Sequence, residues 1–192
     1  QIDLPEVGHP LTPERWREIN TMTISYAHGI AVSPIQLVSG ISALVNGGVL
    51  YQPRIKKISA DFQLKGTRVL STNTSSKMRN LMRLVVKQGT GKNADVPGYL
   101  IGGKTGTAEK PGPRGGYRTQ RIISSFVAAF PMNKPQYVIL ALLDEPKGTR
   151  RTGYHATGGW VAAPVVSAVV KRIAPMLGLT PEDQKDKAMS AN

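Results

Sequence analysis

The feature that most constrains the fold is a pair of apolar runs joined by a very short connection. The runs cover residues 122–130 and 137–143, and both are rich in aliphatic and aromatic side chains. The connection, residues 131–136, contains two prolines and is too short to hold a crossover helix. The two runs are therefore expected to be antiparallel neighbours in one sheet.

Apolar residues at helical spacing predict three helices around this sheet. The first begins at Ser33-Pro34, since serine caps free amides and proline is tolerated in a first turn, and it ends at Asn46-Gly47-Gly48. The second is centred on residues 78–85, and the third covers residues 165–177. The expected fold class is thus α/β in the α+β sense, an antiparallel sheet covered by helices. The other expected features are a short helix at 14–19, strands at 49–51 and 99–108, and a cap for the second helix at Thr72, Thr74 or Ser75.

The balance of charge is strongly basic. The 192 residues include 25 Lys plus Arg and 12 Asp plus Glu, a formal charge of +13, which favours polyanionic partners. The basic residues are scattered, so a solvated basic surface is one interpretation and a nucleic-acid-binding module is another. The second would need a basic stripe with interleaved aromatic residues, and the 6% aromatic content without such a stripe argues against it.

Metal, cofactor and membrane signals are weak in this sequence. There is no cysteine, and the three histidines are too far apart for a zinc signature, so neither a metal nor a cofactor is expected. The longest apolar stretch, residues 160–170, is far shorter than the roughly 20 residues of a membrane span. The sequence starts with Gln1, and we expect it to be part of a longer protein.

The stretch GYLIGGKTGTAEK, residues 98–110, is compatible with two chemistries. Counted from Gly98 it has the spacing of a phosphate-binding loop, and counted from Lys104 it reads Lys-Thr-Gly-Thr, the third signature of enzymes that acylate a serine with β-lactams or peptidoglycan peptides. A phosphate loop must lead into a helix, but residues 106–116 hold four glycines and two prolines. The second interpretation is therefore favoured.

Strand alternation gives the Lys-Thr-Gly-Thr residues distinct tasks. Lys104 and Gly106 are expected on one face of the strand, with Thr105 and Thr107 on the other. On an edge strand, the lysine can hold a terminal carboxylate and the hydroxyls can bind the same ligand, while glycine lets a ligand approach the backbone. A backbone N–H at this place can stabilise a developing oxyanion.

The regions flanking this motif make the pattern more specific. Together with the motif they resemble consecutive landmarks of class B penicillin-binding proteins, and are most similar to the septal, cell-division type of Gram-negative bacteria. The landmarks lie at residues 25–37, 46–49, 103–110 and 144–148, in the family's order.

The resemblance implies a β-lactamase/transpeptidase-like fold and D,D-transpeptidation of peptidoglycan stem peptides. Lys104 would attract the carboxylate of the substrate or of a β-lactam, and Thr105 and Thr107 would hydrogen-bond it. Gly106 would leave room, and the Thr107 amide would form half of the oxyanion hole. The implied partners are stem peptides, β-lactams and cell-division proteins, without nucleic acid, at the periplasmic face of the inner membrane.

The sequence departs from the family pattern at the catalytic serine. No Ser-x-x-Lys occurs in the chain, and Ser71-Thr72-Asn73, which spells the second signature, lies too close to Lys104 and is better explained as a turn and helix cap. We therefore expect residues 1–179 to be the C-terminal part of a transpeptidase domain, an incomplete domain whose nucleophile and membrane anchor lie upstream and which is inactive alone. Residues 180–192 are expected to be a polar, disordered tail. A penicillin-binding sensor without turnover remains an alternative.

Two further segments are candidates for binding. The loop at residues 111–121 carries Arg114, Arg118 and Arg121, which can guide an acidic glycan–peptide polymer or simply be solvated. The Gly-rich segment 144–159 can line a cleft or a partner surface, and its Tyr154 and His155 are candidates for substrate contact.

Overall fold

The computed structural model describes residues 8–25, 29–59, 62–112 and 117–182. For Pro111 and residues 117–120 it describes the backbone alone. The described residues belong to two compact units, residues 1–78 and 79–192, and the boundary between them falls inside one helix.

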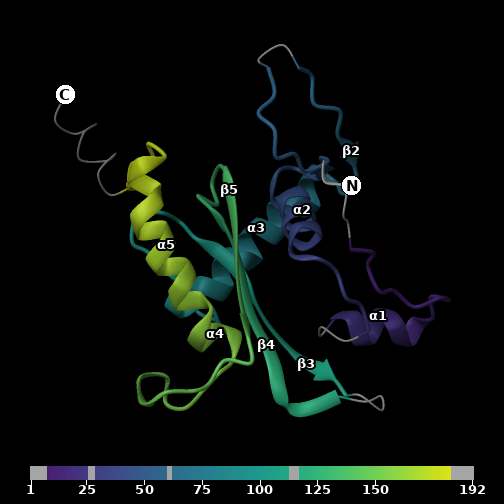
Figure 1. Cartoon of the computed structure of the whole chain (residues 1–192). Coiled ribbons are helices and arrows are strands. Elements are labelled where there is room, and N and C mark those ends of the chain that lie inside the picture. The colour runs from purple at the N-terminus through teal and green to yellow at the C-terminus, as the bar shows by residue number, and fades with distance from the viewer. Residues whose placement is uncertain (1–7, 26–28, 60–61, 113–116, 183–192) are drawn as a thin grey trace. The chain divides into compact units, whose positions relative to one another are not determined.

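In the described part of the first unit there are two complete helices and a two-stranded ladder. The helices are α1 (Glu18–Ser25) and α2 (Pro34–Val45), and the strands are β1 (Val49–Leu50) and β2 (Thr67–Arg68), which pair antiparallel (Figure 1). The strand expected at residues 49–51 is confirmed as β1, whereas its partner β2 was not expected. The helix expected at residues 14–19 is wrong in position, because α1 starts at Glu18. The Asn20 side chain accepts a hydrogen bond from the Arg17 N–H at 2.8 Å, which holds the preceding residues in a turn.

Helix α2 begins and ends where its sequence signals predict. The Ser33 side chain accepts from the Gln36 N–H at 3.4 Å, and the Gln36 side chain accepts from the Ser33 N–H at 2.8 Å, a reciprocal capping box. At the other end Gly47 and Gly48 have φ values of +100° and +96°, which are costly for residues with a Cβ. A Cβ at Gly48 would also collide with the carbonyl of Leu70. The chain is thereby turned from α2 into β1.

Helix α3 (Thr72–Lys87) contains the boundary between the units. The expected caps Thr72, Thr74 and Ser75 are wrong, because the Ser71 hydroxyl accepts from the Thr74 N–H at 3.0 Å. Ser75 is fully buried and accepts from the Gly47 N–H instead. The interpretation of Ser71-Thr72-Asn73 as a helix cap is confirmed.

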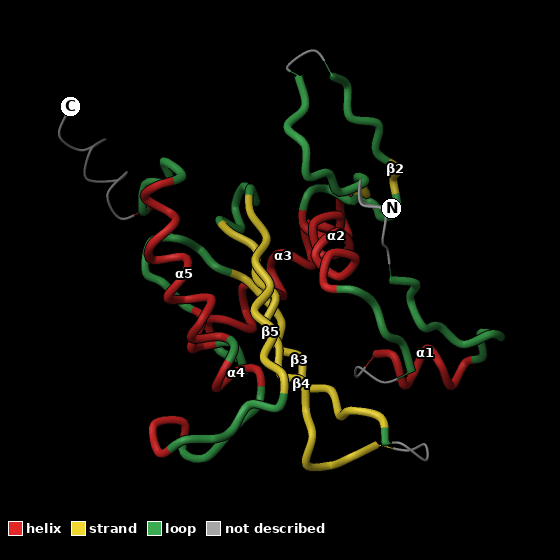
Figure 2. Tube along the Cα trace, in the orientation of Figure 1, coloured by secondary structure: helices red, strands yellow, loops and turns green. Residues whose placement is uncertain are grey.

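The second unit is built on an antiparallel sheet with the strand order β3-β4-β5. Its strands are β3 (Gly102–Pro111), β4 (Tyr117–Phe130) and β5 (Tyr137–Asp144), which lie side by side in Figure 2. The predicted pairing of the two apolar runs is confirmed, with Phe130 opposite Tyr137. The expected start of β3 at Tyr99 is wrong, because Leu100 has a φ of +44° and interrupts the extended chain.

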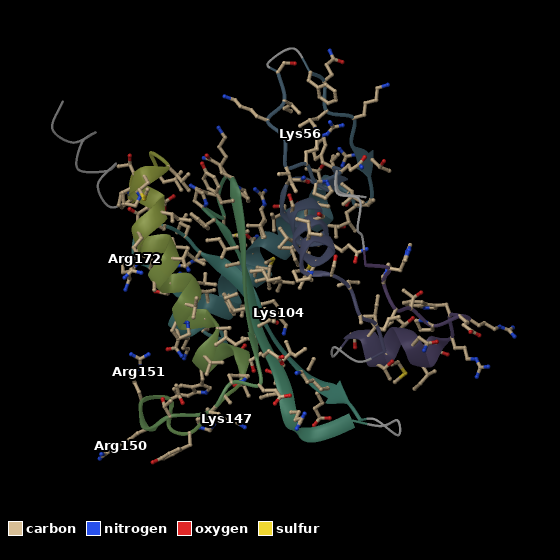
Figure 3. The ribbon with its side chains drawn as sticks, in the orientation of Figure 1. Lys56, Lys104, Lys147, Arg150, Arg151 and Arg172 are labelled. Atoms are coloured by element: carbon tan, nitrogen blue, oxygen red, sulfur yellow. The ribbon has the colours of Figure 1, made fainter. Side chains whose placement is uncertain are left out.

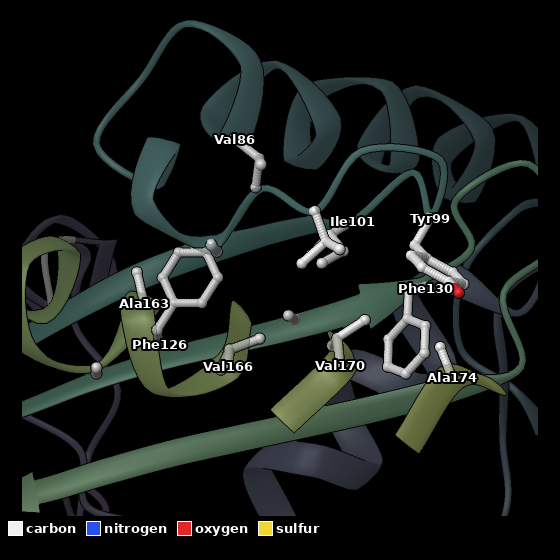
Figure 4. Close-up of a cluster of buried hydrophobic side chains, with 13 residues drawn as sticks. Val86, Tyr99, Ile101, Phe126, Phe130, Ala163, Val166, Val170 and Ala174 are labelled. Atoms are coloured by element: carbon white, nitrogen blue, oxygen red, sulfur yellow. The ribbon is translucent and has the colours of Figure 1, made fainter. Parts of the chain in front are cut away.

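Two helices cover one face of this sheet, namely α4 (Gly158–Val161) and α5 (Ala163–Met176). Helix α5 confirms the predicted third helix, whereas α4 was not predicted. The hydrophobic core lies between α5 and the sheet, and it includes the rings of Phe126 and Phe130, which are both fully buried (Figure 4). The predicted α+β arrangement is confirmed.

The other short elements are the 3₁₀ turns η1 (Lys92–Ala94) and η2 (Arg150–Thr152). Of the tail expected at residues 180–192, residues 183–192 lie outside the described part, and the Glu182 N–H donates to the Gly98 carbonyl at 3.0 Å. Within the described residues no helix is long and apolar enough to cross a membrane.

Candidate functional site

Strand β3 carries the Lys-Thr-Gly-Thr motif along one edge of the three-stranded sheet. Lys104 and Gly106 lie opposite Val127 and Ser125, while Thr105 and Thr107 lie opposite Phe126 and Ser124. Because paired residues of antiparallel strands share a face, the two threonines lie on the face covered by α4 and α5, and the lysine and glycine lie on the other. The predicted alternation is confirmed. The chain remains extended after Thr105, so the helix that a phosphate-binding loop requires is absent at this place.

A pocket of about 460 Å³ opens on the threonine side of β3. Three segments meet there: the strand itself, the turn that follows α3, and the residues around the start of α4. It includes neither Lys104 nor Gly106, so the motif presents its hydroxyls to the pocket and its cation to the opposite face of the same edge. The lining residues are Gly89, Thr90, Lys92, Asn93, Thr105, Thr107, Thr157, Gly158, Gly159 and Trp160.

Hydrogen bonds join the three segments around the motif hydroxyls. The Thr105 hydroxyl lies 3.0 Å from that of Thr90, and the Thr107 hydroxyl accepts from the Gly158 N–H at 3.3 Å. Opposite them the Asn93 side-chain amide donates to the Gly159 carbonyl at 2.8 Å. These bonds fix both hydroxyl oxygens before any ligand arrives, which reduces the ordering cost of binding.

Two glycines bring the start of α4 into contact with its neighbours. A Cβ at Gly158 would lie 2.2 Å from the Ser125 carbonyl oxygen, and one at Gly159 would lie 2.3 Å from the Thr90 carbonyl oxygen. Both glycines belong to the Gly-rich segment 144–159 that was predicted to line a cleft, and both line this pocket. The adjacent glycines after a loop were the available signal, because two of them together favour close backbone approach. Sequence reasoning did not identify Thr90 or Asn93 as part of the site.

Lys104 is exposed and its charge is not neutralised by an acid. Its Nζ donates to the Thr105 carbonyl at 2.9 Å, and no carboxylate of the described residues lies within 4 Å of it (Figure 3). Gly106 on the same face faces Ser125, whose hydroxyl would lie 2.5 Å from an added Cβ. This face of β3 therefore offers a cation beside a strand segment without side-chain bulk.

Lys110, on the same strand, is by contrast fully engaged. Its Nζ lies 2.6 Å from Asp144 and 3.0 Å from Glu145, and Arg121 lies 3.7 Å from Glu145. The hydrogen bond to Asp144, followed by that to Glu145, raises the pKa of Lys110, and the bond from Lys110 lowers the pKa of Glu145. This cluster closes the end of the sheet where the β3–β4 register shifts between Glu109 and Lys110.

The cluster predicts a pH dependence of stability. Glu145 has a depressed pKa in the folded state, so its contribution is complete above its ordinary pKa and is lost as the pH falls through the lower folded value. The raised pKa of Lys110 matters at alkaline pH. The contribution of Lys110 to stability is lost only as the pH rises through the pKa of the folded state. Lys110→Met should therefore reduce the loss of stability on acidification from pH 6 to 3, measured by urea unfolding. Lys134→Met, at an exposed hairpin lysine, is the control, and equal acid sensitivity of wild type and Lys110→Met would contradict the assignment.

One aromatic side chain of the segment after β5 lines the pocket. His155 stacks on Trp160, with ring centroids 5.1 Å apart, and Trp160 lines the pocket. Tyr154 is 75% exposed.

Of the three arginines predicted to guide a polymer, Arg121 pairs with Glu145, the side chain of Arg118 is not described, and Arg114 lies outside the described residues. The described residues contain no cluster of His, Cys, Asp and Glu suited to a metal.

Comparison with known families gives a match over most of the chain. A family model described as "Penicillin binding protein transpeptidase domain" matches residues 1–171. A probable peptidoglycan D,D-transpeptidase FtsI of Caulobacter vibrioides is 43% identical over 187 residues, which cover 93% of this chain and 32% of that relative. The chain thus spans less than a third of the relative's length.

Solved structures show the same architecture. The transpeptidase domain of Burkholderia pseudomallei penicillin-binding protein 3, in its apo form, gives a TM-score of 0.77 at 38% identity, covering 92% of this chain and 54% of that one. Penicillin-binding protein 3 of Mycobacterium tuberculosis, complexed with ampicillin, gives a TM-score of 0.79 at 27% identity, covering 93% of this chain and 43% of that one.

Proposed function

Because this chain belongs to the class B penicillin-binding protein transpeptidase family, we propose that it supplies the substrate-binding strand of a septal peptidoglycan D,D-transpeptidase. The solved relatives confirm the transpeptidase-like fold. The observation that carries the proposal is the edge strand β3. On one face it has a lysine with no acidic partner among the described residues, and on the other it has two prearranged threonine hydroxyls. Groups on both faces of the strand can therefore contact a peptide that binds along this edge.

In the proposed reaction a serine attacks the carbonyl carbon of the penultimate D-Ala of a stem peptide. The peptide bond to the terminal D-Ala breaks, and that residue leaves as the free amino acid with a proton on its nitrogen. The amine of a neighbouring stem then attacks the acyl-enzyme, forms the cross-link and regenerates the serine. β-Lactams acylate the same serine and stop at the ester.

The motif residues bind and polarise the substrate in this scheme. Lys104 attracts the terminal carboxylate through a charge-assisted hydrogen bond from one face of the strand edge, and the hydroxyls of Thr105 and Thr107 donate to the bound substrate from the other. Gly106 allows the peptide backbone to lie close to the strand, and the Thr107 N–H stabilises the oxyanion of the tetrahedral intermediate. None of these steps needs a metal or a cofactor.

The nucleophile is proposed to lie upstream, since the chain has no Ser-x-x-Lys. Residues 1–179 are then the C-terminal part of the transpeptidase domain, followed by a tail at residues 180–192. The complete protein would act at the periplasmic face of the inner membrane, held by an N-terminal anchor and assisted by division proteins, and this chain alone would not acylate. Neither alternative, a nucleic-acid-binding module or a sensor without turnover, is favoured by the comparisons.

Covalent labelling with a fluorescent penicillin tests the proposal. The full open reading frame that contains this chain and the chain alone are labelled side by side, and the adduct is mapped to a peptide. We expect label on an upstream serine of the long form and none on the chain alone. A folded long form that takes no label would overturn the proposal, and label without cross-linking of stem peptides would indicate the sensor.

A further inference from the structure

The segment between β5 and α4 carries an unpaired group of positive charges. Lys147, Arg150 and Arg151 are exposed (Figure 3), and residues 146–160 contain no acidic residue. Within the described residues none of the three cations lies within 4 Å of a carboxylate. They differ in this from Lys110, and from Arg83, whose guanidinium lies 2.7 Å from the Asp95 carboxylate, since both of those form ion pairs within the described structure. Their charge is available to a partner.

The same segment holds a tyrosine in an unfavourable backbone conformation. Tyr154 has a φ of +64°, a left-handed value that is unfavourable for a bulky residue. Its N–H donates to the Thr149 carbonyl at 2.8 Å, and Gly148 packs so closely that a Cβ there would collide with the Tyr154 carbonyl. Its side chain is nevertheless 75% exposed, so hydrophobic burial does not compensate the backbone strain. Strain of this kind around an exposed aromatic ring is typical of binding sites.

These charges lie on the same segment as an aromatic ring that lines the pocket on the threonine side of β3. The His155 ring stacks on Trp160, which is 44% exposed and lines the pocket together with Thr105 and Thr107. Three aromatic residues and three cations, all exposed, thus lie within residues 147–160, which we call the aromatic–basic platform. One end of it, Trp160, lines the pocket.

We propose that the aromatic–basic platform binds the glycan strand that carries the stem peptide, beyond the peptide segment held by β3. This inference rests on the proposed function. Aromatic rings stack on the C–H faces of pyranose sugars, and arginine forms charge-assisted bonds with the carboxylates of neighbouring stem peptides. Continuity with the peptide pocket favours this occupant over a lipid surface or a nucleic acid, because sugar, peptide and carboxylates are covalently joined in the same substrate polymer.

Binding of soluble, uncross-linked peptidoglycan strands to the full-length protein tests the platform. The double variant Arg150→Glu/Arg151→Glu should weaken strand binding about tenfold or more and reduce its salt dependence, because two cations that meet carboxylates are reversed. The matched control is Lys171→Glu/Arg172→Glu, another exposed basic pair with the same change in net charge, on α5. Its affinity for the strands should stay within about twofold of wild type at moderate salt, where distant charges are screened.

Three further measurements separate the explanations. Acylation by a fluorescent penicillin should be unchanged in Arg150→Glu/Arg151→Glu. This result would show that the variant is folded, and it tests the proposed transpeptidase function separately from glycan binding by the platform. Arg150→Lys/Arg151→Lys should restore part of the strand affinity. Tyr154→Ala should weaken strand binding without changing its salt dependence, since it removes a stacking surface and no charge.

Several results would overturn the inference. If Arg150→Glu/Arg151→Glu and Lys171→Glu/Arg172→Glu weaken peptidoglycan binding equally, the effect is one of net charge in general. An unchanged affinity of Arg150→Glu/Arg151→Glu for peptidoglycan strands would show that the platform does not bind them. Binding of anionic lipid vesicles or of DNA that is as tight as strand binding, and is lost in the same variant, would identify a different partner. Absence of penicillin labelling in wild type would instead contradict the proposed function.

Discussion

Replacing Lys104 by alanine should lower the second-order rate constant for acylation by penicillin about 30- to 150-fold in the full-length protein. The lysine is exposed, lies on an edge strand and has no acidic partner among the described residues, so a ligand carboxylate would be its counter-ion. A hydrogen bond that involves charged partners contributes about 2–3 kcal/mol, which corresponds to this factor. The unfolding midpoint should barely change, because Nζ donates only to its neighbouring carbonyl.

Lys110→Ala is the matched control, since it removes the same charge from the same strand. Lys110 is held by Asp144 and Glu145, so its loss should affect stability and leave the acylation rate almost unchanged. Lys104→Arg keeps the charge in a different geometry and should restore part of the rate. If Lys104→Ala and Lys110→Ala acylate equally fast, Lys104 does not bind the carboxylate.

The parts of the fold that were predictable depend on local signals. The six-residue connection between β4 and β5 permits only an antiparallel pair, and Ser33 with Gln36 forms a capping box within four residues. The boundaries of β3 were not predictable in the same way. The interruption at Leu100 is a left-handed residue in a sequence, Tyr-Leu-Ile, that favours strand by propensity. Tertiary contacts decide such positions, including the Arg83 guanidinium that binds the Ile101 carbonyl at 2.7 Å.

The candidate site divides along the same line. Lys104 to Thr107 could be identified as candidate binding residues because they form a motif of four consecutive residues. Thr90 lies 15 positions before Thr105, and Gly158 lies 51 positions after Thr107, and only folding brings their atoms within hydrogen-bonding distance. A single sequence read by itself gives no signal for pairs of this kind. The strained backbone of Tyr154 was equally hidden, since the residue type does not favour a positive φ.

The largest loss of stability is expected for Phe126→Ala. Phe126 is fully buried and lies on the core face of β4, under the motif strand. A Cβ at Gly103 would lie 2.6 Å from its ring, and one at Gly91 would lie 2.9 Å from it, so the ring packs directly against the backbones of both segments. Truncation should cost about 3–5 kcal/mol through lost burial and an unfilled cavity, and lower the unfolding temperature by about 6–20 °C.

The functional consequence follows from the position of those two glycines. Gly103 precedes Lys104, and Gly91 lies between Thr90 and Lys92 of the pocket wall. Losing the ring should therefore loosen both sides of the pocket, so acylation at a temperature where the variant is still folded should also slow. Phe126→Leu, which fills part of the space, should lose less of both properties. Phe62→Ala removes the same ring from a 44% exposed position and should change stability by well under 2 kcal/mol. A Phe126→Ala variant as stable as Phe62→Ala would show that this ring does not support the motif strand.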